Sequence, residues 1–460
     1  MKIKNFADLL SSGDREARKV VLKVAEMSLM ELDSYHVIRN MMKLDNKTLH
    51  IGNYQFDISL KKRIYVIGAG KAGNAMAKAV DEILGPLITR GLVIVKKLEA
   101  EDSQIQHIEL IVGGHPLPNI AGWKASQDIL RLVEGARAED LFISLISGGS
   151  SALMSCPVAG ITLEDEILIT DQLLKCSARI LEINAIRRHI SETNGGRLAQ
   201  KIEAKGSELI NIIISDSVGD KSMVNRDRPV AFFGTPVAPD RTTIKDAQDV
   251  LKKFNLLSKA PKSIVNYIMI NDLSRETPKS FGNRVCNFVL RGTTDACEAV
   301  LSSAKKIGLP SMILTTLLEG ESREAGIFLA TIAKEVGMNR RPIPSPCVLV
   351  AGGETTTSIE GSSGKGGPSQ ELALGFAIEV SGKRGICIAA IDTDGTDGPS
   401  DYAGGIADGY TVERAQAVGI DAYSSLRNHD SSTVLAVLKD ALVTGNTGTN
   451  VCDVTLIYIA

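Results

Sequence analysis

The sequence predicts an α/β protein whose parallel sheets are covered by helices on both faces. Three observations favour this class. Short aliphatic runs alternate with segments of helical periodicity along most of the chain. Only 4% of the 460 residues are aromatic, so the core must consist mainly of aliphatic side chains, as in buried parallel strands. Polar or glycine-rich turns follow most of the predicted strands, which is where open parallel sheets bind ligands.

The first half of the chain opens with an amphipathic helical stretch over residues 14–43, as one long helix or a helix pair. A helix is then predicted over 74–84, and a long helical region runs from 163 to about 204. Between these lie predicted strands at 63–67, 91–95, 108–112, 141–147 and 210–216.

The stretch 229–243 is rich in proline and glycine and indicates a connection between domains. We therefore expect two domains, residues 1–240 and 241–460. In the second, helices are predicted at 294–306 and 324–336. Its predicted strands are 287–290, 312–317, 347–350, 386–390 and 454–459.

Composition excludes several functional classes. The net charge is -2 without a basic block, so bulk attraction to nucleic acid or membranes has little support. No run of 18 apolar residues occurs, and the N-terminus lacks the apolar core of a signal peptide. The seven cysteines are scattered, which is typical of reduced thiols. These features predict a cytoplasmic protein.

A glycine-rich turn, Gly68-Ala-Gly70-Lys71-Ala-Gly73, follows a strand and opens a helix. This pattern is typical of dinucleotide sites, but Lys96 and Lys97 stand where an acidic residue would bind the ribose. We expect an anion site at the helix N-terminus, with Lys71 as its cation. An ordinary strand-to-helix turn with an exposed lysine is the alternative.

A second turn, Ser147-Gly148-Gly149-Ser150-Ser151, follows the strand at 141–147. Its backbone amides can form an anion nest, although a serine-capped tight turn would have the same sequence. No GxSxG motif accompanies these serines, which excludes a serine hydrolase of that type.

Two aspartate clusters follow buried strands, one at 215–220 and one at 392–397. Clustered carboxylates repel one another unless a cation or hydrogen bonds neutralise them. Magnesium binds a few carboxylates together with phosphate oxygens and water, so these residues are candidate metal ligands, although Asp-Gly turns explain each cluster separately. The loop 361–371, which contains Lys365, is either a phosphate-binding loop or a surface loop. The candidate metal ligands are Asp216, Asp220, Asp392 and Asp394.

The ordered set of these motifs resembles the MOFRL family of glycerate kinases. The resemblance covers nearly the whole chain, and the matching segments are VIGAGKAGNAMAKAV (66–80), GGHPLPN (113–119), SGGSSALM (147–154), NAIRRHIS with GGRLA (184–199), SDSVGD (215–220), GGETT (352–356), GGPSQELAL (366–374), DTDGTDGP (392–399) and TGTNVCD (447–453).

The resemblance implies an N-terminal Rossmann-like domain, a smaller C-terminal MOFRL-type α/β domain and an active site in the cleft between them. It implies transfer of the γ-phosphoryl of ATP to D-glycerate, giving 2-phosphoglycerate, with Mg²⁺ or another divalent cation. Lys71, Asp216 and Lys365 are the expected catalytic residues. The expected substrate-binding and nucleotide-binding residues are Gly70, His115, Ser147, Gly148, Gly149, Ser150, Arg187, Glu354, Asn446, Thr449 and Asn450.

The chain departs from the family pattern at two positions. The family's GGRNQE arginine is Pro368 here, and the lysine before its GGRLA segment is Asn194. Lys365, Arg187 or Arg188 could supply the missing charge. An NADP-dependent hydroxypyruvate reductase and a non-catalytic nucleotide-binding protein remain alternatives. The expected partners are the small-molecule substrate D-glycerate and a second copy of the chain in a homodimer. Binding to nucleic acid or to a membrane is not expected.

Overall fold

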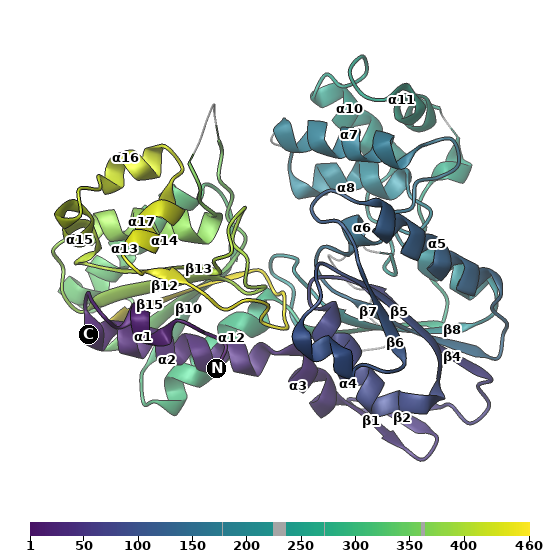
Figure 1. Cartoon of the computed structure of the whole chain (residues 1–460), viewed down its shortest axis with the longest axis horizontal. Helices are drawn as coiled ribbons and strands as arrows, with labels where there is room; N and C mark the ends of the chain where they lie inside the picture. Colours follow the sequence, from purple (N-terminus) through teal and green to yellow (C-terminus); the bar gives the residue numbers. More distant parts are fainter. Residues whose placement is uncertain (177, 224–235, 271, 360–363) are drawn as a thin grey trace. The chain divides into compact units, whose positions relative to one another are not determined.

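A computed structural model of the chain describes residues 1–176, 178–223, 236–270, 272–359 and 364–460. The chain forms two compact units, which are not consecutive in sequence (Figure 1). Unit 1 contains residues 1–33, 215–222 and 291–460, and unit 2 contains residues 34–214 and 223–290. These units differ from the predicted domains 1–240 and 241–460. Residues 1–33 and 215–222 belong to the mainly C-terminal unit, and residues 241–290 belong to the unit that contains most of the N-terminal half.

Unit 2 is built on a six-stranded sheet whose order is β6-β5-β4-β7-β8-β9. The pairs β4–β5, β4–β7, β5–β6 and β7–β8 are all parallel, as the aliphatic runs predict. The strands are β4 (Arg63–Ala69), β5 (Ile88–Val95), β6 (Ile108–Val112), β7 (Asp140–Ile146), β8 (Glu208–Ile214) and β9 (Val285–Arg291).

Helices cover both faces of this sheet (Figure 1). α5 (Ile120–Glu134) and α9 (Arg197–Ala204) share one hydrophobic core with alternate residues of the central strands, among them Ile67 and Phe142. α4 (Gly73–Leu84) packs against β5 and β7 outside that core, and α3 (Ser34–Met41) lies against it. The predicted layered α/β architecture is therefore confirmed for this unit.

A helical layer adjoins the sheet of unit 2. α7 (Leu163–Lys175), α8 (Ile180–His189), α10 (Ile244–Lys253) and α11 (Lys262–Met269) enclose a separate aliphatic core, with Ile169, Ile186 and Ile264 at its centre. The long helical region predicted from 163 to about 204 is thus three helices, α7, α8 and α9. A small antiparallel sheet of β1 (Met42–Asp45), β2 (Thr48–Ile51) and β3 (Tyr54–Asp57) was not predicted, because its short strands carry few aliphatic residues.

Unit 1 contains a second six-stranded sheet, ordered β10-β11-β15-β12-β13-β14. Only β10 and β11 are parallel, and the other neighbours are antiparallel, so this sheet is mixed. A strand that is buried on both faces is an aliphatic run whether it pairs parallel or antiparallel. The sequence pattern therefore could not reveal that the sheet is mixed. The strands are β10 (Ser311–Leu318), β11 (Cys347–Gly353), β12 (Ile386–Asp392), β13 (Gly404–Asp408), β14 (Ala441–Leu442) and β15 (Asp453–Ile459).

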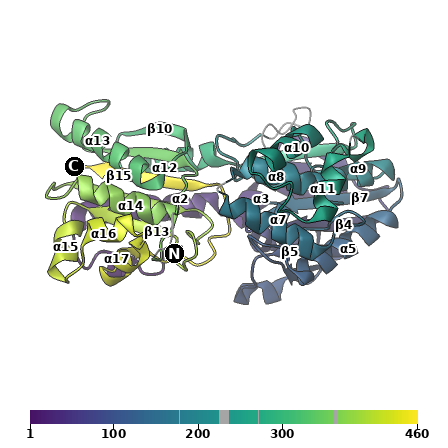
Figure 2. The same cartoon turned by 90° about the horizontal axis from the view of Figure 1, so that it is seen from above.

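Each face of the second sheet has its own hydrophobic core. α13 (Ser322–Asn339) and α14 (Pro368–Glu379) pack on one face, and α2 (Arg15–Leu32) and α12 (Thr293–Lys306) pack on the other (Figure 1). Figure 2 shows the same unit from the side of α14. The predicted stretch 14–43 is therefore two helices that belong to different units, α2 in unit 1 and α3 in unit 2. Within the described ranges, no helix is long and apolar enough to cross a bilayer.

Candidate active site

The two glycine-rich turns of unit 2 lie side by side at the carboxyl ends of β4 and β7. These strands are neighbours, and the strand order reverses direction between them, which is where open α/β sheets bind ligands. The turns are hydrogen-bonded to each other, from Lys71 N to Gly148 O (2.9 Å) and from Ala72 N to Ser147 Oγ (3.0 Å). A Cβ at Gly70 would collide with the Ser147 side chain, so glycine permits this close approach.

The side chains of Lys71 and His115 flank the second turn. A Cβ added at Gly149 would lie 2.9 Å from His115 Cδ2 and 3.3 Å from Lys71 Cγ. Gly149 has a φ of 82°, in the left-handed region, and it caps the short helix α6 (Ser150–Leu153). The structure thus brings together the predicted residues of both turns, Gly70, Lys71, Ser147, Gly148, Gly149 and Ser150, with His115.

Asn194, which replaces a lysine of the family pattern, is buried and fixes α6. Its side-chain amide donates to the carbonyl oxygen of Ser151 (3.1 Å), and its backbone N–H donates to Ser191 Oγ (3.0 Å). Thr193 Oγ1 donates to Met154 O at the other end of α6 (2.7 Å). The segment that follows α8 therefore holds the glycine- and serine-rich turn in place.

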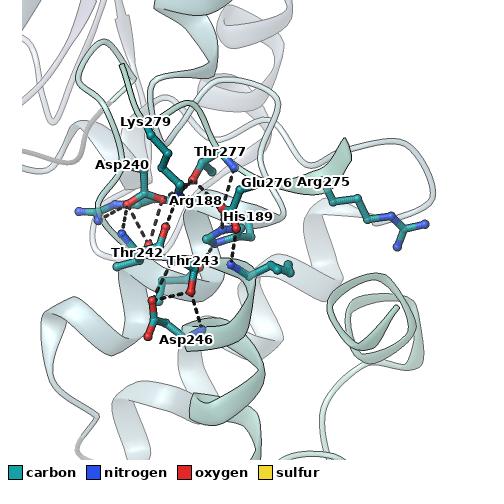
Figure 3. A network of polar contacts seen from close by, with 12 residues as sticks. Arg188, His189, Asp240, Thr242, Thr243, Asp246, Arg275, Glu276, Thr277 and Lys279 are labelled. Carbon is teal, nitrogen blue, oxygen red and sulfur yellow. Dashed lines mark hydrogen bonds and ion pairs between the residues drawn. The ribbon is translucent and has the colours of Figure 1, made fainter. Parts of the chain in front are cut away.

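The C-terminal end of α8 is held by a buried Arg–Asp ion pair and by a partly buried His–Glu hydrogen bond, both shown in Figure 3. Arg188 Nη1 lies 2.9 Å from Asp240 Oδ1, and His189 Nε2 lies 2.8 Å from Glu276 Oε1. Burial alone would raise the pKa of Glu276, but hydrogen bonds from Lys279, His189 and two backbone N–H groups lower it to about 2. Arg188 already has a carboxylate partner, so this network is structural.

The loop 215–220 belongs to unit 1, although it follows β8 of unit 2. Asp220 is buried, and Ser215 Oγ donates to its Oδ2 atom at 2.5 Å. Asp216 is partly exposed and is held from two sides. Asn450 Nδ2 donates to its Oδ2 (3.3 Å), and the Cys452 thiol donates to its carbonyl oxygen (2.7 Å).

The second aspartate cluster forms a tight turn after β12. The backbone N–H of Asp394 donates to Asp392 Oδ1 (3.0 Å), and that of Thr396 donates to Asp394 Oδ1 (2.7 Å). Asp397 caps α14 instead, because its two oxygens accept from the backbone N–H groups of Ser369 (3.0 Å) and Gln370 (2.8 Å). Burial raises the pKa of Asp397 to about 6 although these donors favour its ionised form.

Thr393 joins the aspartate turn to the loop 446–453, which contains the predicted residues Asn446, Thr449 and Asn450. Its hydroxyl donates to Cys452 O (2.6 Å) and accepts from Val451 N (2.9 Å). Because Cys452 also contacts Asp216, three segments that are distant in sequence meet within unit 1. The hydroxyl of Thr449 is buried and has no hydrogen-bond partner among the described residues.

Asp453 is a further carboxylate beside the predicted site residues, and the sequence analysis did not single it out. It is opposite Gly353 of β11 and opposite Asp392 of β12 in the sheet register, so Glu354, Asp453 and Asp392 lie at the same end of the sheet. Burial and the surrounding carboxylates, Asp392 foremost, raise the pKa of Asp453 well above its usual range. In the sequence, Asp453 was marked only by its place at the end of the TGTNVCD segment. That motif does not show that Asp453 pairs with Asp392 across antiparallel strands.

Two family models match the chain. A model described as a domain of unknown function (DUF4147) matches residues 20–269, and the MOFRL family model matches residues 347–453. The chain is 37% identical to the glycerate 2-kinase of Pyrococcus horikoshii, covering 96% of this chain and 98% of that protein. The chain belongs to the MOFRL family of glycerate kinases.

Other relatives agree with this membership. The D-glycerate 2-kinase of Thermotoga maritima is 38% identical over 85% of this chain and 89% of its own length. A crystal structure of a glycerate kinase from Thermotoga maritima matches with a TM-score of 0.76 and 34% identity, covering 96% of this chain and 99% of that one. A relative in Agrobacterium vitis, 35% identical over 86% of this chain and 87% of its own length, carries a provisional hydroxypyruvate reductase name.

The position of the family arginine, Pro368, is the first residue of α14, where its fixed φ suits a helix start. Lys365 precedes it and is exposed, with its backbone N–H bound to Asp430 Oδ1 (3.0 Å). Residues 361–363 of the predicted phosphate-binding loop lie outside the described residues.

Among the described residues of unit 1, the carboxylates do not form a metal cage of the usual kind. No group of three or more histidine, cysteine, aspartate or glutamate side chains in the described part of the chain has a metal-binding geometry. Burial and the neighbouring carboxylates, Asp392 foremost, favour the neutral form of Asp453. One or two carboxylates suffice when the remaining magnesium ligands are phosphate oxygens and water.

Proposed function

We propose that the chain transfers the γ-phosphoryl group of ATP to D-glycerate and gives 2-phosphoglycerate and ADP. The observation that carries this proposal is membership of the MOFRL family of glycerate kinases over nearly the whole chain. The paired glycine-rich turns beside Lys71 and His115 support it, because phosphoryl transfer depends mainly on positioning and on charge neutralisation.

We assign the anion-binding role in unit 2 to Lys71 and the two turns. The ammonium of Lys71 binds either the transferring phosphoryl group or the carboxylate of glycerate. The backbone amides of Gly148, Gly149 and Ser150 bind an anionic group nearby, and His115 borders the same turn.

We assign magnesium binding to unit 1, where the carboxylates gather. The candidates are Asp216 and Asp220, or Asp392 and Asp394. Asp216 is favoured over Asp220, because it is more exposed and because Ser215 already binds the Asp220 carboxylate. When bound, Mg²⁺ would neutralise the phosphate charges. Glu354, Asn446, Thr449 and Asn450 are assigned to nucleotide binding, and the buried, unpartnered hydroxyl of Thr449 supports its place there.

A coupled assay tests the activity. Purified protein with ATP, Mg²⁺ and D-glycerate should release ADP, and ³¹P NMR of the product should show a phosphate on the secondary hydroxyl at C2. A phosphate on C3 would contradict the regiochemistry, and no ADP release with any divalent cation would contradict the kinase.

Hydroxypyruvate reductase is the second candidate, supported by the provisional name in Agrobacterium vitis and by Lys96 and Lys97 after β5. A reductase needs a proton donor next to the substrate carbonyl, commonly a histidine held by an acid and accompanied by an arginine. No such His–Arg–acid set can be picked out in the sequence. Oxidation of NADPH by hydroxypyruvate, measured in the same preparation, decides between the two activities. Loss of both would favour a non-catalytic nucleotide-binding protein.

Six of the seven cysteines are buried, and this supports a reducing compartment such as the cytoplasm.

A further inference from the structure

Arg187 has a buried guanidinium edge without a partner. The residue lies in the last turn of α8 and keeps 6% of its surface exposed. Its Nε and Nη2 atoms are buried, and neither has a hydrogen-bond partner among the residues that the structure describes. These two N–H groups lie on one edge of the guanidinium plane and can bind both oxygens of a carboxylate in parallel. A buried, unpaired charge is unfavourable, so an anion or water must complete this edge.

Arg63 of the same unit shows how such an edge is completed. Its Nε donates to Asp140 Oδ1 (3.0 Å) and its Nη2 donates to Asp140 Oδ2 (2.5 Å). The two atoms used by Arg63 are the two that lack a partner in Arg187. Arg63 thus shows the bidentate carboxylate contact for which the Nε–Nη2 edge of Arg187 has the donors but, among the described residues, no acceptor.

The carboxylate that influences Arg187 does not fill its Nε–Nη2 edge. Glu166 of α7 acts on Arg187 electrostatically, but within the described ranges the two form no ion pair. The Glu166 Oε2 atom instead accepts a hydrogen bond from Ser155 Oγ at 2.5 Å. Burial lowers the pKa of Arg187 and raises that of Glu166, as expected for two groups that do not neutralise each other in direct contact.

The surroundings connect Arg187 to the candidate anion site of unit 2. α8 packs against α6, the short helix that opens with Ser150. The segment that follows α8 binds α6 through Asn194 and Thr193. Ser155, the partner of Glu166, lies two residues after the end of α6. The helix that carries Arg187 is thus joined through α6 to the turn that borders Lys71.

We propose that the Nε–Nη2 edge of Arg187 binds the carboxylate of the hydroxy-acid acceptor. This assignment rests on the proposed function and leaves Lys71 to the phosphoryl group. The substrate class is a short hydroxy acid, because a planar anion with two oxygens matches the edge. A polyol such as glycerol carries no such group and leaves the guanidinium unpaired.

Two variants test the assignment. Arg187→Lys keeps the charge but removes the planar edge, and Arg187→Gln removes both. Isothermal titration with D-glycerate in the absence of nucleotide should give a Kd raised at least tenfold in Arg187→Lys, and further in Arg187→Gln, because lysine offers no bidentate contact. The KM for ATP should stay within twofold. Arg63→Lys is the matched control, since it breaks a bidentate carboxylate pair that is already satisfied, and its Kd for D-glycerate should not change.

The outcomes separate this inference from the proposed function. Unchanged Kd and KM for D-glycerate in both Arg187 variants, with lowered thermal stability, would overturn the inference and show a structural arginine bridged by water. The kinase assignment would then still stand on its own assay. If the parent protein binds D-glycerate through Arg187 but releases no ADP, the proposed function fails and the carboxylate site remains. If Arg187→Gln does not fold, Arg187→Lys alone decides the question.

Discussion

The side-chain amide of Asn450 donates a hydrogen bond to the carboxylate of Asp216, Nδ2 to Oδ2 at 3.3 Å, across 234 residues of sequence. Two residues further on, the Cys452 thiol donates to the Asp216 carbonyl oxygen. Both side chain and backbone of Asp216 are therefore positioned by one segment, the loop before β15. Such fixed placement is what a carboxylate needs in order to bind a cation without reorganisation.

Asp216→Asn and Asp394→Asn should each raise the Mg²⁺ concentration needed for half-maximal turnover. Each change removes one negative charge from the end of the sheet where the carboxylates gather, and the nucleotide needs a bridging cation. Chelation should abolish turnover in the parent, and Mg²⁺ should restore it. A Mg²⁺ titration of each variant is the measurement, with the exposed Asp401→Asn as the control. Identical titrations for both variants and the parent would show that these aspartates only build turns.

Lys71→Ala should lower kcat/KM on the order of 10²–10³-fold, since an electrostatic stabiliser of the transferred group is removed. The thermal midpoint should change little, because Lys71 lies in a turn and no core cluster includes it. Steady-state kinetics and a thermal melting curve of the variant test this prediction. Lys97→Ala is the matched control, because Lys97 is an exposed lysine paired with Glu99. A folded Lys71→Ala variant with nearly normal turnover would exclude Lys71 from the site.

Lys365→Ala should lower kcat/KM at least tenfold, about 1.4 kcal/mol, if Lys365 replaces the arginine that the family has at Pro368. Pro368→Arg should then restore part of the activity in the Lys365→Ala background. The helix start should tolerate the change, because Asp397 still accepts from the N–H groups of Ser369 and Gln370. Kinetics of Arg187→Ala and Arg188→Ala in parallel identifies any other source of charge. A Lys365→Ala rate within twofold of the parent removes Lys365 from the mechanism.

Glu276→Gln should destabilise the protein at neutral pH and have no effect near pH 2. The folded-state pKa of Glu276, about 2, lies below its usual value of 4.5. Its stabilising contribution is therefore complete above pH 4.5 and is lost as the pH falls through 2. Partial exposure limits the effect to about 1–2 kcal/mol. Urea unfolding at pH 7, 5 and 3 measures it, with exposed Glu164→Gln as the control. A difference from the parent that is constant across pH would contradict the pairing in Figure 3.

Arg18→Met should destabilise unit 1 by about 3–5 kcal/mol, because two buried carboxylates lose their common partner. Arg18 donates to Asp408 Oδ2 (2.5 Å) and to both oxygens of Asp440 (2.6 and 3.0 Å), and all three side chains are fully buried. Urea unfolding measures the loss in the free energy of unfolding, with Arg15→Met, at an exposed position, as the control. Equal midpoints for the two variants would mean that α2 is held by its apolar face alone.

The N-terminal segment shows where reasoning from sequence reached its limit. The periodicity over 14–43 correctly predicted helix, since the spacing of apolar residues depends only on local geometry. It left open whether the stretch is one helix or a pair, and it gave no sign that the two parts on either side of Asp33 pack in different units. That division is decided by distant partners, Asp408 and Asp440 for Arg18, which no local pattern encodes.

By itself the sequence determined the α/β class, the positions of most strands and the two glycine-rich turns, because aliphatic runs and glycine reflect burial and local backbone geometry. It also placed Lys71 and the aspartates at strand ends. Only the tertiary structure decided that the second sheet is mixed, that Asp216 is held by Asn450 within unit 1, and that Asp453 is opposite Asp392. Strand direction and pairing depend on contacts between residues far apart in the chain, and a linear pattern of side chains carries no record of them.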